Sequence, residues 1–149
     1  MKPLVAYYSR TGNTRKVAEK IAQKLNADID EIVDHKKREK AIGWIFAGRD
    51  ATLKKHTDIS FQKDPTAYDF VIIGTPVWAF SLTPAVRTYL SKNKIKNVAF
   101  FCTHGGRKGK VFEEMEKLSL KPKAVLDIVD KNIDECEEKI NNFCSMLSS

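Results

Sequence analysis

The sequence predicts an α/β fold in which a five-stranded parallel sheet is covered by helices on both faces. Short apolar runs alternate with segments of helical spacing, and three of the runs are apolar almost throughout, as in strands buried on both sides. The expected strands are Leu4–Tyr8, Ile29–Val33, Phe70–Gly74, Val98–Cys102 and Ala124–Val129. Because no internal repeat or linker rich in Pro, Gly or Ser interrupts residues 1–149, we expect a single domain.

The segments between these runs predict crossover helices. After the first strand, Val17, Ile21 and Leu25 recur at helical spacing, which predicts the first helix. Further helices are expected directly after Pro84 and over residues 109–118. Such connections join neighbouring strands in a parallel sheet.

A C-terminal helix is expected to bury one apolar face. The residues on that face are Ile133, Cys136, Ile140, Phe143, Cys144 and Leu147. The chain has three cysteines, and their spacing fits neither a disulfide framework nor a metal site, so we interpret them as small apolar residues in a reducing compartment. No metal site is predicted.

Basic residues are concentrated in the middle of the chain. The net charge is +7, and residues 35–63 hold eight Lys or Arg against three acidic residues. Within this part a helix interrupted near Gly48 is expected. The charge is compatible with an acidic protein partner, an anionic substrate, nucleic acid or a merely solvated surface. Since neither a secretory signal nor a membrane span is recognisable, we expect a cytoplasmic protein without a membrane partner.

The order of the strands predicts where a ligand binds. The run 29–33 mixes apolar and acidic residues, which is typical of an edge strand and favours the order 2-1-3-4-5. In a sheet of this order the ligand crevice lies at the carboxyl ends of the first and third strands. We therefore expect the loops 9–14, 75–81 and 103–109 to converge there.

The first of these loops suits a phosphate group. It runs Ser9-Arg10-Thr11-Gly12-Asn13-Thr14, between a strand and a helix. The start of a helix offers unpaired N–H groups and the positive end of its dipole, hydroxyls add donors, and Gly12 permits close approach. An ordinary strand-to-helix turn with a Thr cap is the alternative, and the density of hydroxyls favours the phosphate.

The other two loops suit a planar ring. Trp78 follows the end of a strand within a polar segment and is better explained by a planar ligand than by the core, whereas Phe80 fits both equally. Gly105 and Gly106 leave backbone groups accessible to the polar edge of a heterocycle. His104 is interpreted as a loop residue near the ring, and no catalytic residue is assigned.

Three other classes of site are not supported, because the motif that each requires is absent or has the wrong spacing. A phosphatase loop needs five residues between its Cys and Arg, but only four separate Cys102 from Arg107. The dinucleotide pattern G-x-G-x-x-G and the Walker pattern are both absent, which argues against a Rossmann NAD fold and an ATPase.

The loop 9–14 resembles the phosphate loop of the flavodoxins and flavodoxin-like FMN proteins, Ser/Thr-x-Thr-Gly-x-Thr, at every fixed position. The stretch 68–78 is similar to the third strand and first flavin-flanking loop of that family. The resemblance covers nearly the whole chain. It implies a three-layer flavodoxin-like fold with noncovalently bound FMN.

The resemblance also implies which residues contact FMN. Arg10 stands at a variable position and receives no separate role. The implied cofactor-binding residues are Ser9, Arg10, Thr11, Gly12, Asn13 and Thr14 at the phosphate, and Thr75, Pro76, Val77, Trp78, Ala79, Phe80, Thr103, His104, Gly105 and Gly106 at the ring.

The function this implies is electron transfer between redox partner proteins. Flavodoxins are usually acidic, so the basic charge here predicts partners with acidic docking faces. An FMN-dependent NAD(P)H or quinone oxidoreductase is the alternative. A flavin-free basic module that uses residues 36–38 is a third hypothesis, and since aromatic residues do not interleave that patch, nucleic acid is not an expected partner.

Overall fold

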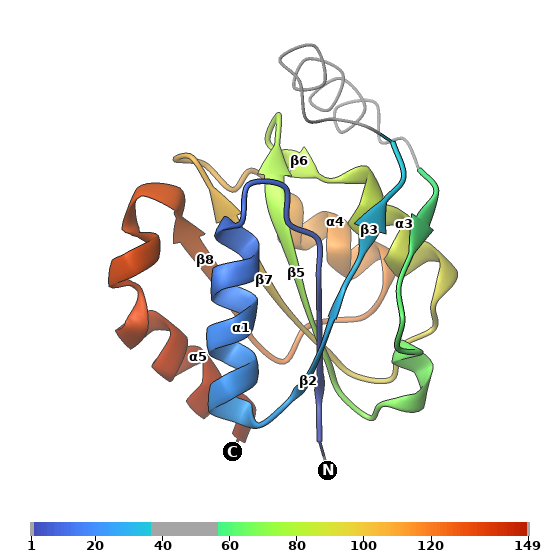
Figure 1. Cartoon of the computed structure of the whole chain (residues 1–149), viewed down its shortest axis with the longest axis horizontal. Helices are drawn as coiled ribbons and strands as arrows, with labels where there is room; N and C mark the ends of the chain where they lie inside the picture. Colours follow the sequence, from blue (N-terminus) through green and yellow to red (C-terminus); the bar gives the residue numbers. More distant parts are fainter. Residues whose placement is uncertain (1, 37–56, 149) are drawn as a thin grey trace.

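A computed structural model describes residues 2–36 and 57–148 of the chain, and it has the predicted α/β architecture (Figure 1). Five parallel strands form the main sheet in the order β2-β1-β5-β7-β8, which is the predicted order 2-1-3-4-5. Their bounds are β1 Leu4–Tyr7, β2 Asp28–Glu31, β5 Val71–Trp78, β7 Val98–His104 and β8 Val125–Val129. The helix expected near Gly48 and most of the basic segment 35–63 lie outside the described residues.

Helices cover both faces of this sheet. The apolar residues of α1 and α5 pack with one face of the strands, and those of α3 and α4 pack with the other, so two separate cores flank the sheet. The bounds are α1 Asn13–Leu25, α3 Pro84–Lys92, α4 Val111–Leu118 and α5 Glu137–Ser148, with 3-10 helices η1 Pro65–Ala67 and η2 Asp130–Glu135. The carboxyl ends of β1, β5 and β7 lie at the end of the molecule opposite to both termini (Figure 1).

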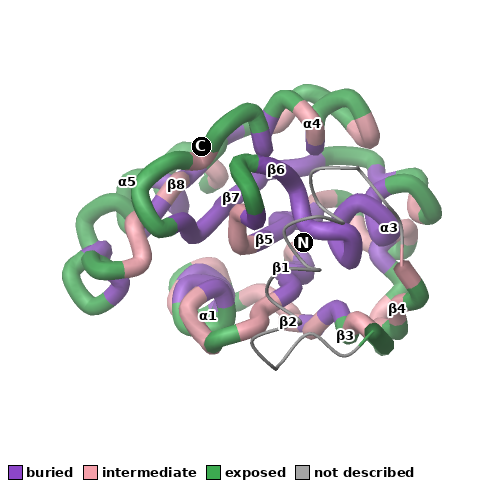
Figure 2. Tube along the Cα trace, turned by 90° about the horizontal axis from the view of Figure 1, so that it is seen from above, coloured by how far each residue is buried: buried purple, intermediate pink, exposed green. Residues whose placement is uncertain are grey.

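Because successive side chains point to opposite faces of the sheet, each strand contributes residues to both cores. In β1, Val5 and Tyr7 face the core under α1, whereas Leu4 and Ala6 face the other core. Every residue of β1 and β7 is buried, as Figure 2 also shows, while the helices keep exposed outer faces. Gly74 belongs to this packing because a Cβ at that position would meet the ring of Phe101.

Several predicted boundaries were wrong. The expected strand 29–33 ends at Glu31, because Val33 turns away to pair with Ser60 in a separate antiparallel sheet of β3 (Val33–Asp34) and β4 (Ile59–Ser60). The strand expected to end at Gly74 continues to Trp78, where it pairs with the antiparallel strand β6 (Ser81–Leu82).

Two further boundaries need correction at the C-terminal side. The strand expected to end at Cys102 continues to His104, because its last two residues still pair with β8. The single helix expected at the C-terminus is divided at Cys136, between η2 and α5. The predicted apolar face is nonetheless confirmed, since Ile133, Ile140 and Phe143 are buried together.

Candidate functional site

The turn from β1 into α1 is held together by one hydroxyl. Ser9 Oγ accepts hydrogen bonds from the N–H of Gly12 and from the N–H of Arg15, both at 3.2 Å. Gly12 adopts φ 99°, in the left-handed region that glycine tolerates without strain, and the helix begins at the next residue. The turn therefore has a fixed shape before any ligand binds.

This turn leaves backbone donors at the start of the helix. The first N–H groups of a helix have no acceptor within it. Oγ of Ser9 accepts the hydrogen bond of the Arg15 N–H, whereas the N–H groups of Asn13 and Thr14 have no acceptor among residues 2–36 and 57–148. A hollow of about 310 Å³ lies at the turn. Its lining residues are Ser9, Arg10, Thr11, Gly12, Arg15 and Glu31. These groups fit an anion such as a phosphate monoester.

The hydroxyl of Thr14 points away from solvent. Thr14 is buried, and its Oγ1 lies 2.8 Å from Oγ1 of Thr103 at the end of β7. This hydrogen bond fastens the first loop to the third. The hydroxyl of Thr14 therefore joins two loops, while its backbone N–H, in the first turn of α1, has no acceptor among the described residues.

The second loop is a tight β-hairpin rather than an open loop. Thr75, Pro76, Val77 and Trp78 belong to β5, and only Ala79 and Phe80 form the turn into β6. Both turn residues have positive φ, 49° and 60°, as in a type I′ turn. Phe80 exposes 62% of its surface at the tip, so this aromatic ring is accessible at the edge of the site.

Trp78 lies within the core. It is only 4% exposed, and its ring packs edge-on against Tyr8 with centroids 5.6 Å apart. The guanidinium of Arg10 lies 5.8 Å from the centre of the same ring. The structure thus brings Trp78 to the predicted place but covers its faces with neighbours from the β1–α1 turn.

The third loop is anchored by His104. The N–H of Gly106 donates to Nδ1 of this imidazole at 3.1 Å, so that nitrogen carries no proton, and Nε2 donates to Oδ2 of Asp127 at 3.0 Å. Both ring nitrogens are therefore engaged, and the side chain is buried. His104 positions the loop 105–106 against β8.

The third loop also packs on the hairpin. Gly109 has φ 57°, and a Cβ at this position would collide with the carbonyl oxygen of Phe80. Together with the Thr14–Thr103 hydrogen bond and the Tyr8–Trp78 contact, this packing brings the three loops to one place at the carboxyl end of the sheet.

The family model described as Flavodoxin matches residues 2–131. The chain belongs to the flavodoxin family. Its structure is similar to that of a flavoprotein from Lactobacillus acidophilus NCFM, crystallised in complex with FMN, with 25% identity and a TM-score of 0.72 over 90% of this chain and 97% of that one. No curated protein sequence matches the chain.

Two further solved structures share the fold of this family member. A flavoprotein from Bacteroides uniformis ATCC 8492 has 22% identity and a TM-score of 0.76, with 94% of this chain and 97% of that one covered. Oxidised flavodoxin 2 from Bacillus cereus has 21% identity and a TM-score of 0.64, with 99% and 98% covered.

Residues 2–36 and 57–148 of this family member contain neither a helix suited to cross a membrane nor a cluster suited to bind a metal ion. None of the helices there combines the length and the apolar character that crossing a membrane requires. No group of three His, Cys, Asp or Glu in these ranges is placed to hold a metal ion.

Sequence reasoning missed three side chains beside the β1–α1 turn. Arg15 donates from Nε to the hydroxyl of Tyr7 at 3.1 Å and from Nη2 to Oε1 of Glu31 at 2.7 Å. Burial raises the pKa of Tyr7, and the hydrogen bond that Arg15 donates to Tyr7 raises the pKa of Arg15. The one available signal was the pairing of the first two strands, which sets Tyr7 beside Glu31.

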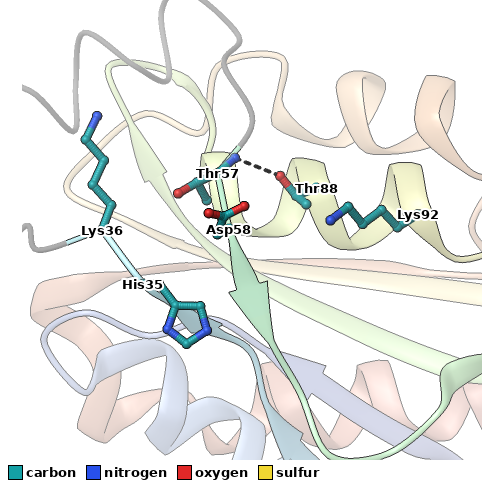
Figure 3. Close-up of a pocket in the computed structure, with 6 residues that line it drawn as sticks. All are labelled: His35, Lys36, Thr57, Asp58, Thr88 and Lys92. Carbon is teal, nitrogen blue, oxygen red and sulfur yellow. Dashed lines mark hydrogen bonds between the residues drawn. The ribbon is translucent and has the colours of Figure 1, made fainter.

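A larger cavity lies elsewhere, on the side of β3, β4 and α3 (Figure 3). Its volume is about 580 Å³, and one hydrogen bond, from the N–H of Thr57 to Oγ1 of Thr88 at 3.0 Å, crosses it. The lining residues are His35, Lys36, Thr57, Asp58, Thr88 and Lys92. None of these belongs to the three loops, so size alone does not locate the site predicted from the sequence.

Proposed function

We propose that this protein binds FMN noncovalently and carries electrons between redox proteins in the cytoplasm. The observation that carries the proposal is the β1–α1 turn, where Ser9 ties the loop, the N–H groups of Asn13 and Thr14 have no acceptor among the described residues, and a hollow of about 310 Å³ lies at the turn. A phosphate monoester is the ligand that such a turn fits best. The similar flavoprotein from Lactobacillus acidophilus NCFM was crystallised with FMN.

The residues of the three loops fit the two parts of this cofactor. The N–H groups of Asn13 and Thr14, with the hydroxyls of Ser9 and Thr11, hold the phosphate. For the ring, the second and third loops offer the exposed Phe80 at the hairpin tip and the exposed Gly105 and Gly106. Trp78 and His104, which are buried against protein neighbours, support these loops from behind. When bound, FMN supplies the group that accepts and donates electrons, and the protein supplies position, apolar packing and hydrogen bonds.

The surface beside the site favours the binding of protein partners whose docking faces are acidic. Phe80 is exposed at the tip of the hairpin, and Gly109 packs against the backbone of that tip. The loop around Gly109 carries Arg107, Lys108 and Lys110, of which the first and last are exposed. An apolar tip beside three cations attracts a partner of opposite charge and gives it an apolar contact.

A visible spectrum of the purified protein, followed by stepwise anaerobic reduction, tests the proposal. We expect a yellow protein with a flavin spectrum that is reduced chemically and reoxidised by an acidic redox protein, without rapid oxidation of NADPH. Rapid NADPH oxidation with a quinone would instead assign an oxidoreductase. A protein that stays colourless after reconstitution with FMN would overturn the proposal.

A charge placed in the loop gives the matched comparison. Thr11 is exposed at the hollow, so Thr11→Glu sets a carboxylate against the phosphate and should abolish retention of FMN. Gln23→Glu adds the same charge near the other end of α1 and should leave retention unchanged. Equal retention of FMN by both variants would show that the phosphate does not bind at this turn.

A further inference from the structure

We propose that Arg15 makes the site select phosphorylated over unphosphorylated flavin, and that Glu31 limits this selectivity. The inference rests on the proposed function, because it concerns the same phosphate. Arg15 and Glu31 both line the hollow of about 310 Å³ at the β1–α1 turn. The backbone and hydroxyl donors of the phosphate loop are neutral. The guanidinium of Arg10, which also lines the hollow, lies 5.8 Å from the centre of the Trp78 ring. A second cation in the wall therefore changes what the site can distinguish.

Arg15 belongs to the loop through its backbone as well as its side chain. Its N–H donates to Oγ of Ser9 at 3.2 Å, in the hydrogen-bond pair that fixes the turn. Its guanidinium is held by two strands, through Nε to the hydroxyl of Tyr7 at 3.1 Å and through Nη2 to Glu31 at 2.7 Å. Tyr7 and Glu31 are themselves neighbours in the register of β1 and β2. The cation is therefore already fixed at the wall of the hollow.

The guanidinium keeps donors for a ligand. It has five N–H groups, of which the two anchoring bonds use two. Within the described ranges, 2–36 and 57–148, the other three have no acceptor. A guanidinium fixed in this way binds a phosphate with little further loss of side-chain freedom.

Arg15 and Glu31 act on a phosphate with opposite signs. The two side chains are 50% and 36% exposed, so water weakens the electrostatic effect of each charge on a phosphate but does not abolish it. A phosphate dianion is attracted by Arg15 and repelled by Glu31, whereas the hydroxyl that replaces it in riboflavin is almost indifferent to both. An ion pair that only stabilised the fold would affect the two flavins equally.

Dissociation constants for FMN and riboflavin, measured by flavin fluorescence, test the inference. The proteins compared are the wild type, Arg15→Gln, Glu31→Gln and the control Lys16→Gln, which removes a cation from the next, exposed position of α1. We expect Arg15→Gln to weaken FMN about tenfold, since a charged hydrogen bond is lost, and to change riboflavin less than about twofold.

Glu31→Gln should strengthen FMN about threefold at low salt and leave riboflavin unchanged, because it removes repulsion from the hollow. Lys16→Gln should alter the FMN-to-riboflavin ratio less than about twofold. Inorganic phosphate should compete with FMN on the wild type and less on Arg15→Gln.

The outcomes separate this inference from the proposed function. A wild type that binds neither flavin would overturn the proposed function. A wild type that binds FMN, together with an Arg15→Gln variant that keeps the FMN-to-riboflavin ratio or loses both flavins equally, would overturn the role of Arg15 alone. Circular dichroism and urea unfolding establish that each variant is folded.

Discussion

Nη2 of Arg87 lies 2.5 Å from Oε2 of Glu114, in an ion pair that joins α3 to α4. Both side chains are largely buried, at 7% and 13% exposure. Oγ of Ser81 donates to the two oxygens of the same carboxylate at 2.9 and 3.0 Å. Since Ser81 pairs with Trp78 across the hairpin, Glu114 connects two helices to the loop that carries Phe80.

This connection predicts that Glu114→Gln strongly lowers the free energy of unfolding. The amide keeps the shape of the side chain but leaves the buried guanidinium of Arg87 without its counter-charge, and Nε of Arg87 already has no partner in the described part of the chain. We expect the free energy of unfolding to fall by about 3 kcal/mol, measured by urea denaturation. Glu113→Gln, an exposed neighbour on α4, should change it by less than about 0.5 kcal/mol. Similar losses in the two variants would show that the ion pair contributes nothing specific.

The hairpin turn predicts a stabilising substitution. Ala79 and Phe80 both have positive φ, a conformation that costs non-glycine residues about 1 kcal/mol each. Ala79→Asn combined with Phe80→Gly supplies the residues that a type I′ turn favours and should raise the free energy of unfolding by about 1–2 kcal/mol. Thermal unfolding of the protein without FMN measures this, and unchanged stability would mean that the turn is not strained.

The same turn explains why the hairpin was not predicted from the sequence. Type I′ turns are recognised by Asn-Gly or Asp-Gly, and Ala79-Phe80 has neither. The first part of β5, to Gly74, and the strand β7 were predicted because they are buried on both faces and therefore apolar, whereas β6 was not predicted. Tertiary packing, through Gly109 and Glu114, holds a turn that the local sequence disfavours.

The parts of the candidate site that depend on the order of the strands and on local residue types were predictable from the sequence. The positions of the three loops follow from the order of the strands, and the Ser9–Thr14 turn follows from local residue types. The partners of Arg15 were not predictable in this way, because they come from β1 and β2 and meet it only through strand register and side-chain reach. The burial of Trp78 likewise depends on Tyr8 and Arg10.

Trp78 and Phe80 should respond differently to truncation. Both aromatic residues lie in one hairpin, but Trp78 is 4% exposed and Phe80 is 62% exposed. Trp78→Ala should lower the free energy of unfolding of the protein without FMN by about 3 kcal/mol, because it opens a cavity in the core. Phe80→Ala should change it by less than about 0.5 kcal/mol. If the two variants unfold at the same urea concentration, Trp78 is not a core residue.

A hydrogen bond between Tyr68 and Asp28 predicts how stability depends on pH. The hydroxyl of Tyr68 donates to Oδ2 of Asp28 at 2.7 Å. This bond raises the pKa of Tyr68 to about 12 and lowers the pKa of Asp28. Folding thus favours the neutral phenol and the ionised carboxylate. The contribution of the bond to stability should be complete between about pH 5 and pH 9, where both groups hold these forms even in the unfolded chain.

Outside this range the contribution should be lost in two directions. As pH rises from about 10 to about 12, the unfolded phenol ionises first and the folded phenol follows, so stability declines. As pH falls below about 4, the unfolded carboxylate binds a proton before the folded one, and stability declines again. The difference in unfolding free energy between the wild type and Tyr68→Phe should therefore form a plateau near neutral pH and narrow at both ends.

Tyr89→Phe is the matched control for this measurement. Tyr89 is fully buried, its hydroxyl has no hydrogen-bond partner within residues 2–36 and 57–148, and burial raises its pKa strongly. Removing this hydroxyl should leave stability near neutral pH unchanged or slightly higher, because an unsatisfied polar group is removed. Urea unfolding of the three proteins at a series of pH values gives the comparison. A difference for Tyr68→Phe that stays constant from pH 3 to pH 12 would contradict the coupling between Tyr68 and Asp28.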